Sequence, residues 1–345
     1  MNYLEQLKRL CATPAPSGYE FSAARRIALL LERYLETVEI DALGNVIGLL
    51  RCGKKNAKTV LLDAHIDEIG LIVSGHKDGF LQFEPLGGVD LRILPGREVQ
   101  VCADTPMLGV VTCMPPHLQT RAETEKAIKK DALYIDVGLS QEEALEKAPI
   151  GTPIVFAADC VQLQNKCISG RALDDRACFC AILRTLELIS NAKRNVDVVV
   201  VGSVQEELGC RGARVAGFAI NPDYAIAVDV THGNTPDAPR SKTFEVGGGT
   251  VIGIGPNLHP GLTKLLTKLA KEKKIPHQIE VCEGNTGTNA WVLQTVREGI
   301  KTGLLSVPLK YMHTPVETLC EKDLEATAKL LASAVLALGE EGRRV

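Results

Sequence analysis

The stretch "TVLLDAHIDEIG", residues 59–70, joins a largely apolar run directly to a group of titratable side chains. Its first half predicts a buried β-strand. Four titratable side chains follow on the exit of that strand: Asp63, His65, Asp67 and Glu68. Burying charge is costly unless the charge is paired or binds a metal ion. The strand therefore either ends in solvent or delivers these groups to a positively charged centre.

The whole chain limits the classes of protein that this stretch can belong to. At roughly 150 residues per domain, 345 residues predict about two domains. A net charge of −3 gives no field that attracts nucleic acid or an anionic membrane, so neither is expected as a partner. No apolar run reaches the length of a membrane span. The charged N-terminal pattern "MNYLEQLKRL" lacks the features of a signal peptide, so we expect a cytoplasmic protein.

The 11 cysteines are odd in number and irregular in spacing, with no CxxC pair. This pattern argues against a disulfide framework or a zinc-finger site. We expect most of them to be buried thiols that pack as small apolar side chains.

Strand and helix patterns alternate on both sides of a different central segment, which predicts an α/β fold with a mixed sheet and helices on both faces. Predicted strands cover residues 38–41, 45–51, 59–65, 196–204, 223–230, 249–255 and 302–309. Predicted helices cover residues 2–12, 20–36, 174–189, 259–273, 288–298 and 321–340.

The segment 69–160 has short alternating runs between Gly, Pro and Asp, together with a charged stretch at 120–130 and one short helix at 140–148. This spacing is typical of a small β-rich unit. We therefore expect a catalytic domain made of residues 1–68 and 161–345, with an inserted β-rich domain at 69–160.

Carboxylates and imidazoles follow the predicted strands at the edge where open α/β sheets bind ligands. These side chains are His65, Asp67, Glu206, Glu207, Asp229 and His313, and the pair Asp174 and Asp175 precedes a helix. Each motif alone can be purely structural, such as a helix cap for the Asp pair or a solvated turn for the Glu pair. Their joint occurrence at strand exits favours a site for one or two divalent cations. The other histidines, His76, His117, His232, His259 and His277, are expected to lie outside this site.

The spacing within two motifs suggests distinct roles. His65 and Asp67 face the same way in an extended strand, so His65 can bind a metal while Asp67 accepts from its other ring nitrogen. Adjacent Glu206 and Glu207 cannot easily reach the same atom. One can bind metal, and the other can act as general base for a water molecule whose pKa the metal lowers to about 7.

The motifs "APSGYE", "DAHIDEIG", "SGRALDDRA", "QEELGCRGA", "AVDVTHGNTPD", "IGPNLHP", "TGTNA" and "YMHTPVE" together resemble metallopeptidase family 42. That family comprises glutamyl, leucyl and lysyl aminopeptidases, including tetrahedral aminopeptidases, and some members carry an endoglucanase or cellulase label. The resemblance covers nearly the whole chain. It implies a zinc-peptidase catalytic domain, an inserted oligomerisation domain and a homo-oligomer, commonly a dodecamer, that hydrolyses short peptides.

The resemblance also implies a role for each candidate residue around two divalent metal ions, zinc above all, with cobalt or manganese as alternatives. His65 and Asp229 would hold one metal, with Asp67 behind His65. Asp174 would bridge the two metals, and Glu207 with His313 would hold the second. Glu206 would be the general base. A cis peptide bond is expected between Asp174 and Asp175.

Two positions depart from the family pattern. Asn289 stands where the family often has Asp, which bears on substrate preference and activity, and Cys178 stands where Gly is common, with little expected effect. Three other functions remain open. Another metal amidase, such as a deacylase or carboxypeptidase, could use the same ligands. A glycosidase needs two carboxylates around a sugar and is disfavoured by 4% aromatic content and the single Trp291. A non-catalytic binding protein is the third.

Overall fold

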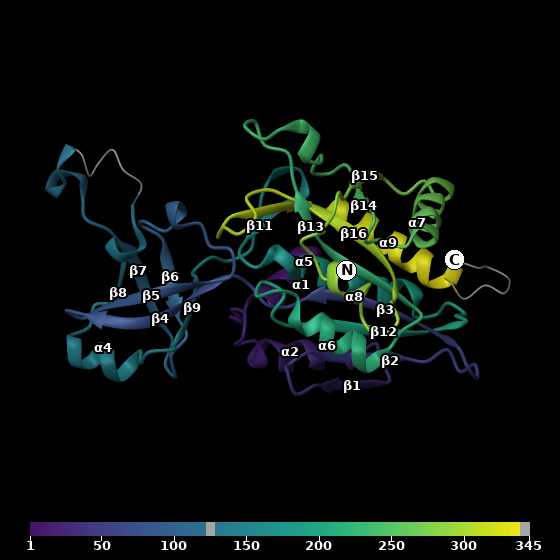
Figure 1. Cartoon of the computed structure of the whole chain (residues 1–345), viewed down its shortest axis with the longest axis horizontal. Coiled ribbons are helices and arrows are strands. Elements are labelled where there is room, and N and C mark those ends of the chain that lie inside the picture. The colour runs from purple at the N-terminus through teal and green to yellow at the C-terminus, as the bar shows by residue number, and fades with distance from the viewer. Residues whose placement is uncertain (122–127, 339–345) are drawn as a thin grey trace.

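The computed structural model describes residues 1–121 and 128–338. It has two parts, a large layered body and a small barrel to one side of it (Figure 1). The large body contains an eight-stranded mixed sheet with helices on both faces. This confirms the predicted α/β class.

The large sheet has the strand order β1-β2-β12-β3-β13-β16-β14-β15. Its strands are β1 Thr37–Ile40, β2 Val46–Leu50, β3 Lys58–His65, β12 Val196–Ser203, β13 Tyr224–His232, β14 Thr250–Ile254, β15 His277–Val281 and β16 Lys301–Leu309. The four central strands β12, β3, β13 and β16 are mutually parallel. Their carboxyl ends therefore meet at one edge of the sheet.

Helices cover both faces of this sheet. They are α1 Tyr3–Cys11, α2 Phe21–Leu31, α5 Leu173–Ile189, α6 Arg211–Ile220, α7 Pro260–Glu272, α8 Ala290–Leu293 and α9 Glu321–Leu338. Leu62 of β3 packs in the cluster that includes α5 and α9, whereas the next residue back, Leu61, packs in the cluster of α6 and α8. This alternation follows from the two-residue period of a strand.

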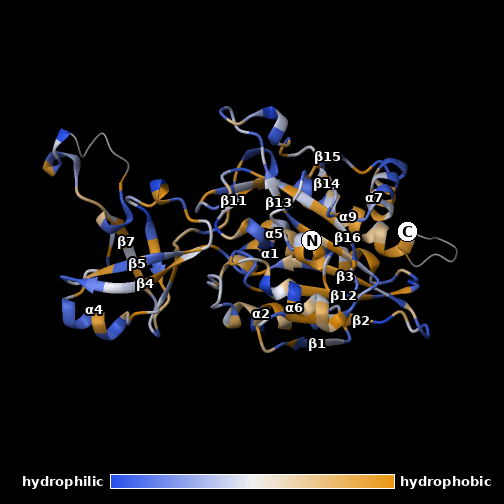
Figure 2. Ribbon diagram, in the orientation of Figure 1, coloured by the Kyte–Doolittle hydropathy of each residue, from blue (hydrophilic) through white to orange (hydrophobic). Residues whose placement is uncertain are grey.

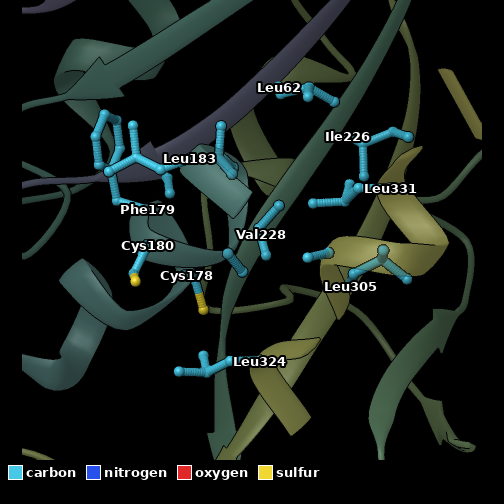
Figure 3. Packing of buried hydrophobic residues seen from close by; sticks show 14 of the residues in the cluster. Leu62, Cys178, Phe179, Cys180, Leu183, Ile226, Val228, Leu305, Leu324 and Leu331 are labelled. Carbon is cyan, nitrogen blue, oxygen red and sulfur yellow. The ribbon is translucent and has the colours of Figure 1, made fainter. Parts of the chain in front are cut away.

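The larger cluster forms the main core. Figure 3 shows Ile226 and Leu305 of the sheet beside Leu331 of α9, and Phe179 of α5 and Leu62 of β3 belong to the same cluster. Full burial of such a side chain contributes about 1.5–3 kcal/mol to stability. The same strands are the hydrophobic bands of the layered body in Figure 2. The core therefore fixes the central strands whose carboxyl ends carry the candidate site.

Some predicted elements differ from the observed ones. The predicted helix at 288–298 is only α8, because the chain turns through Arg297 at φ 52° and returns Ile300 to the core. Helix α6 was not predicted, since Gly212 and Gly217 lower helix propensity. The end of the predicted last helix, 339–340, and part of the charged stretch, 122–127, lie outside the described residues.

The small part is a closed barrel with the strand order β4-β5-β8-β7-β6-β9. Its strands are β4 Gly70–Lys77, β5 Phe80–Leu86, β6 Glu98–Val101, β7 Met107–Thr112, β8 Tyr134–Asp136 and β9 Pro153–Phe156. The barrel has its own hydrophobic cluster, and helix α4 Gln141–Lys147 begins with a capping box between Ser140 and Glu143. A three-stranded sheet of β10 Val161–Gln162, β11 Cys167–Gly170 and β17 Glu317–Cys320 follows.

The cysteines and the helices bear on two further expectations. All 11 cysteines are free thiols, and the majority of them are buried, as the sequence predicted. Among the described residues, none of the helices combines the length and apolar character that crossing a bilayer requires.

Candidate metal centre

The carboxyl edge of the central strands gathers the predicted site residues in one place. Strand β3 ends at His65, β13 carries Asp229, and the segments after β12 and β16 supply the Glu pair and His313. Six of the predicted residues line one cavity of 260 Å³: His65, Asp174, Glu206, Glu207, Asp229 and His313. Asp67, the seventh, is fully buried behind His65, within 3.4 Å of its ring.

Asp174 lies between the two imidazoles. Its Oδ1 is 3.1 Å from Nε2 of His65, and its Oδ2 is 3.3 Å from Nε2 of His313. The same His313 nitrogen is 3.2 Å from Oε1 of Glu207. The two oxygens of one carboxylate thus point to two separate groups of donors.

Three groups of residues each bring their potential donor atoms within 4.8 Å of one another. They are His65 with Glu206 and Glu207, His65 with Asp175 and Asp229, and Asp174 with Glu207 and His313. Imidazole nitrogens and carboxylate oxygens are the ligands that zinc and similar divalent cations use in hydrolases. Oδ1 of Asp175 is buried without a hydrogen-bond partner. The donor set therefore fits divalent cations. Asp175, which the sequence prediction did not assign as a ligand, lies within it.

The centre has more carboxylates than cationic side chains. Burial raises the pKa of Glu206 to about 7; nearby His65 opposes this shift, whereas Glu207 and Asp67 add to it. Burial and the neighbouring Asp229 hold the pKa of Asp175 well above its usual range. Burial alone would lower the pKa of His313, but hydrogen bonds to Asp174 and Glu207 raise it to about 11. This excess of negative charge is what a bound cation would neutralise.

Asp67 orients several neighbours at once. Its carboxylate accepts hydrogen bonds from the backbone N–H groups of Glu206 and Glu207, at 3.0 and 3.1 Å. Nδ1 of His65 is 3.1 Å from the Asp67 carbonyl oxygen and 3.4 Å from its carboxylate. Asp67 therefore lies against the histidine ring, as the spacing suggested, and also holds the start of the Glu pair, which the spacing did not predict.

The peptide bond between Asp174 and Asp175 is cis, as predicted. Glu317, which the sequence prediction missed, holds the adjoining backbone. Its Oε2 accepts from the N–H groups of Leu173 and Asp174, at 2.8 and 3.1 Å, and its Oε1 accepts from the N–H of His313 at 3.0 Å. The sequence feature that could have indicated Glu317 is its position four residues after His313 in "YMHTPVE".

A loop of the barrel also reaches the centre. The Gly88 carbonyl oxygen, in the loop after β5, lies 3.1 Å from Nδ1 of His313. A Cβ atom at Gly88 would stand 2.7 Å from that nitrogen. A Cβ atom at Gly87, whose φ is 75°, would come within 3.2 Å of Glu207. Only glycine permits this close approach of backbone to predicted ligands.

The two departures from the family pattern lie beneath the centre. Asn289 is 2% exposed, and its Nδ2 donates to Oδ2 of Asp63 at 2.7 Å and to Ser203 at 2.8 Å. Asn289 therefore partners a buried carboxylate and does not line the cavity. The thiol of Cys178 donates to the Asp229 carbonyl oxygen at 3.1 Å.

Imidazoles and carboxylates at the carboxyl edge of a mixed sheet are the donor set that metal-dependent hydrolases use. The family model described as M42 glutamyl aminopeptidase matches residues 44–330. The chain therefore belongs to the M42 glutamyl aminopeptidase family, whose members are metal-dependent peptide hydrolases. This confirms the resemblance found in the sequence.

Known proteins agree with this assignment along the whole chain. The lysyl aminopeptidase of Pyrococcus furiosus is 38% identical over 338 residues, which cover 96% of each protein. An aminopeptidase from the archaeon Desulfurococcus kamchatkensis has a TM-score of 0.90 at 33% identity, covering 97% of this chain and 94% of that one. The TET1 peptidase of Pyrococcus horikoshii, which can assemble into a tetrahedron or an octahedral shell, has a TM-score of 0.86 at 32% identity, covering 97% and 99%.

Proposed function

We propose that this aminopeptidase binds two divalent cations, with Asp174 as the bridging ligand. The observation that carries the proposal is the position of Asp174, whose two oxygens face His65 on one side and His313 on the other. His65 and Asp229 would complete one cation site, and Glu207 with His313 the other. Asp175 lies within reach of the first site. Zinc suits these ligands, and cobalt or manganese are the alternatives.

Two cations, when bound, supply Lewis-acid activation of the scissile carbonyl and of the attacking water. Glu206 is the proposed general base. Sγ of Cys210 lies 3.2 Å from its Oε1, so its other oxygen can face a water molecule in the cavity. The carboxylate accepts a proton as the water oxygen bonds to the carbonyl carbon, and it donates that proton to the nitrogen as the carbon–nitrogen bond breaks. Asp67 acts as a positioning residue for His65 and the Glu pair.

The direct test is a panel of aminoacyl chromogenic substrates with free and acetylated amino groups. We expect turnover of the free-amine substrates with added zinc, cobalt or manganese, and loss of turnover after chelation. Preferential hydrolysis of the acetylated or C-terminally free peptides would instead identify a deacylase or carboxypeptidase. Metal analysis of the active protein tests the stoichiometry, and a single cation per chain would contradict the dinuclear proposal.

We also propose that residues 69–160 form the domain through which copies assemble, with residues 1–68 and 161–345 as the catalytic domain. Apolar side chains on the barrel support this. Leu108 of β7 is 61% exposed and Leu118, beyond it, is 74% exposed, with Val110 and Met114 exposed beside them in sequence. Such side chains are typical of interaction surfaces.

Light scattering tests the assembly. A dodecamer would have about twelve times the 37.1 kDa mass of one chain, whereas a stable monomer would exclude the proposal. A cytoplasmic location stays a prediction from the sequence.

A further inference from the structure

The cavity extends past the metal centre to a wall formed by other parts of the sheet and its loops. Beyond the predicted ligands and Glu206, its lining includes Thr231, His232, Glu280, Leu304 and Met312. Four of the ten further lining residues carry a hydroxyl group. Within the described part of the chain, this lining contains no lysine or arginine.

Glu280 gives this wall its negative charge. It lies on the edge strand β15, is half-buried, and belongs to none of the candidate donor groups. Its Oε1 accepts a hydrogen bond from the Thr231 hydroxyl at 3.1 Å. A carboxylate has about four acceptor positions, so this one hydrogen bond leaves capacity for a cationic partner.

The distance between Glu280 and the metal centre follows from strand geometry. Thr231 lies two residues beyond Asp229 on β13, so the two side chains point to the same face. Two residues of a strand span about 6.5–7 Å. Thr231, and the Glu280 carboxylate bound to it, therefore stand about one long side chain from the predicted ligand Asp229. A substrate whose first carbonyl lies at the centre can direct its first side chain along β13 to this wall.

We propose that Glu280 is a specificity-determining residue that selects peptides with lysine or arginine at the N-terminus. This proposal rests on the aminopeptidase function proposed above. A cationic side chain can lay its methylene stem against Leu304 and Met312 and pair its head with the Glu280 carboxylate. A glutamate side chain would be repelled by the Glu280 carboxylate, and His232 is the basic side chain of this wall that could pair with it. A leucine side chain would cover the Glu280 carboxylate without offering it a cationic partner.

The test compares kcat/KM for Lys, Arg, Leu and Glu chromogenic substrates in the metal-loaded enzyme. Glu280→Gln keeps the size of the side chain and an oxygen that can accept from Thr231. We expect the Lys-to-Leu ratio to fall about 10–100-fold, the range of a hydrogen bond to a charged group. Glu280→Arg should reverse the preference toward Glu. Glu283→Gln, which changes an exposed carboxylate on the following segment outside the lining, is the matched control and should leave the ratio unchanged.

Binding of lysinamide and leucinamide, measured by calorimetry, separates this inference from the proposed function. If lysinamide binds more tightly than leucinamide and Glu280→Gln removes the difference, the inference stands even when no peptide is turned over. Turnover without any preference for basic residues, or an equal loss on Lys and Leu substrates in Glu280→Gln, overturns the inference and leaves the aminopeptidase function intact. A wild-type preference for Glu that His232→Gln abolishes also overturns it.

Discussion

Two groups of buried charges lie on either side of the end of β3, and they differ in how their charge is balanced. In one, which we call the arginine cluster, the Glu68 carboxylate pairs with Arg171 and Arg176. Arg176 is completely buried, and its guanidinium also donates to the backbone carbonyls of Leu10, Thr13 and Ile66. The candidate metal centre has the opposite composition, with carboxylates in excess of the two imidazoles.

The adjacent residues Asp67 and Glu68 show what this difference teaches. Both are buried, yet Asp67 contacts residues of the candidate metal centre while Glu68 belongs to the arginine cluster. A buried charge that the chain itself pairs stabilises the local structure. A buried charge that the chain leaves in excess implies a partner from outside the chain. Burial alone does not separate a structural group of charges from a functional one; the local balance does.

The strongest test of the functional side is Glu206→Gln. We expect a loss of turnover of about 10²–10⁴-fold because the variant cannot accept a proton. Metal content should stay unchanged, since the amide keeps an oxygen at the same place. Glu142→Gln, on the exposed face of α4, should retain full activity. Residual activity above about a hundredth of wild type would contradict the assignment of the base.

The substitution Arg176→Met tests whether the arginine cluster stabilises the fold. This change leaves Glu68 buried with one fewer cationic partner, and we expect the free energy of unfolding to fall by about 3–5 kcal/mol. Lys147→Met, which removes an exposed pair with Glu143 on α4, should have a far smaller effect because water screens that pair. Urea denaturation at one protein concentration measures both. Equal losses in the two variants would mean that the arginine cluster does not stabilise the fold.

Metal removal should affect only one of the two groups of charges. Because cations bind the folded centre, chelation should lower the melting temperature, by the equivalent of about 2.7 kcal/mol when the metal had been present at a hundred times its Kd. Asp174→Asn should largely abolish this shift, whereas Arg176→Met should preserve it on a lower baseline. A melting temperature that does not respond to chelation would argue against the metal centre.

The smallest predicted effect concerns the pair beneath the centre. Burial raises the pKa of Asp63 to about 6 even though it bonds to Ser203 and Asn289. Asn289→Asp would set a second carboxylate against it, raising the pKa of the pair further above its unfolded value. We expect a loss of about 1–2 kcal/mol at neutral pH, about one pKa unit. The loss should shrink as the pH falls below the raised pKa, because the folded pair takes up a proton and is no longer repulsive, and it should disappear near the unfolded Asp pKa of about 3.9.

The exchange of the two residues, Asp63→Asn with Asn289→Asp, is the matched control. It restores one carboxylate and one amide, so it should recover most of the stability lost in Asn289→Asp. Chemical unfolding at pH 5 and pH 7 gives both comparisons. A destabilised exchange variant would show that the orientation of the pair matters more than its charge.

Much of the sheet could be predicted from sequence because a continuous apolar run such as 196–204 is typical of a strand buried on both faces. The predicted site residues could be found for a related reason, since each one follows a buried strand or precedes a buried helix. Asp175 was found with Asp174 before the helix but was given no ligand role, and Glu317 could not be found this way. Glu317 bonds to the backbone of Asp174, 143 residues away in the chain, and no local pattern specifies such a contact. The short β15, which carries Glu280, lacks an apolar run and was also missed.

The approach of Gly88 to His313 has a consequence for how the molecule can vary. If His313 binds a cation through Nε2, its remaining proton lies on Nδ1 and donates to the Gly88 carbonyl, while Nε2 faces the side of Asp174 and Glu207. The barrel thus selects the tautomer of a histidine that belongs to the other part of the molecule. Any rearrangement that pulled the barrel away would release that imidazole, so neither part can be exchanged for an unrelated module without rebuilding the other.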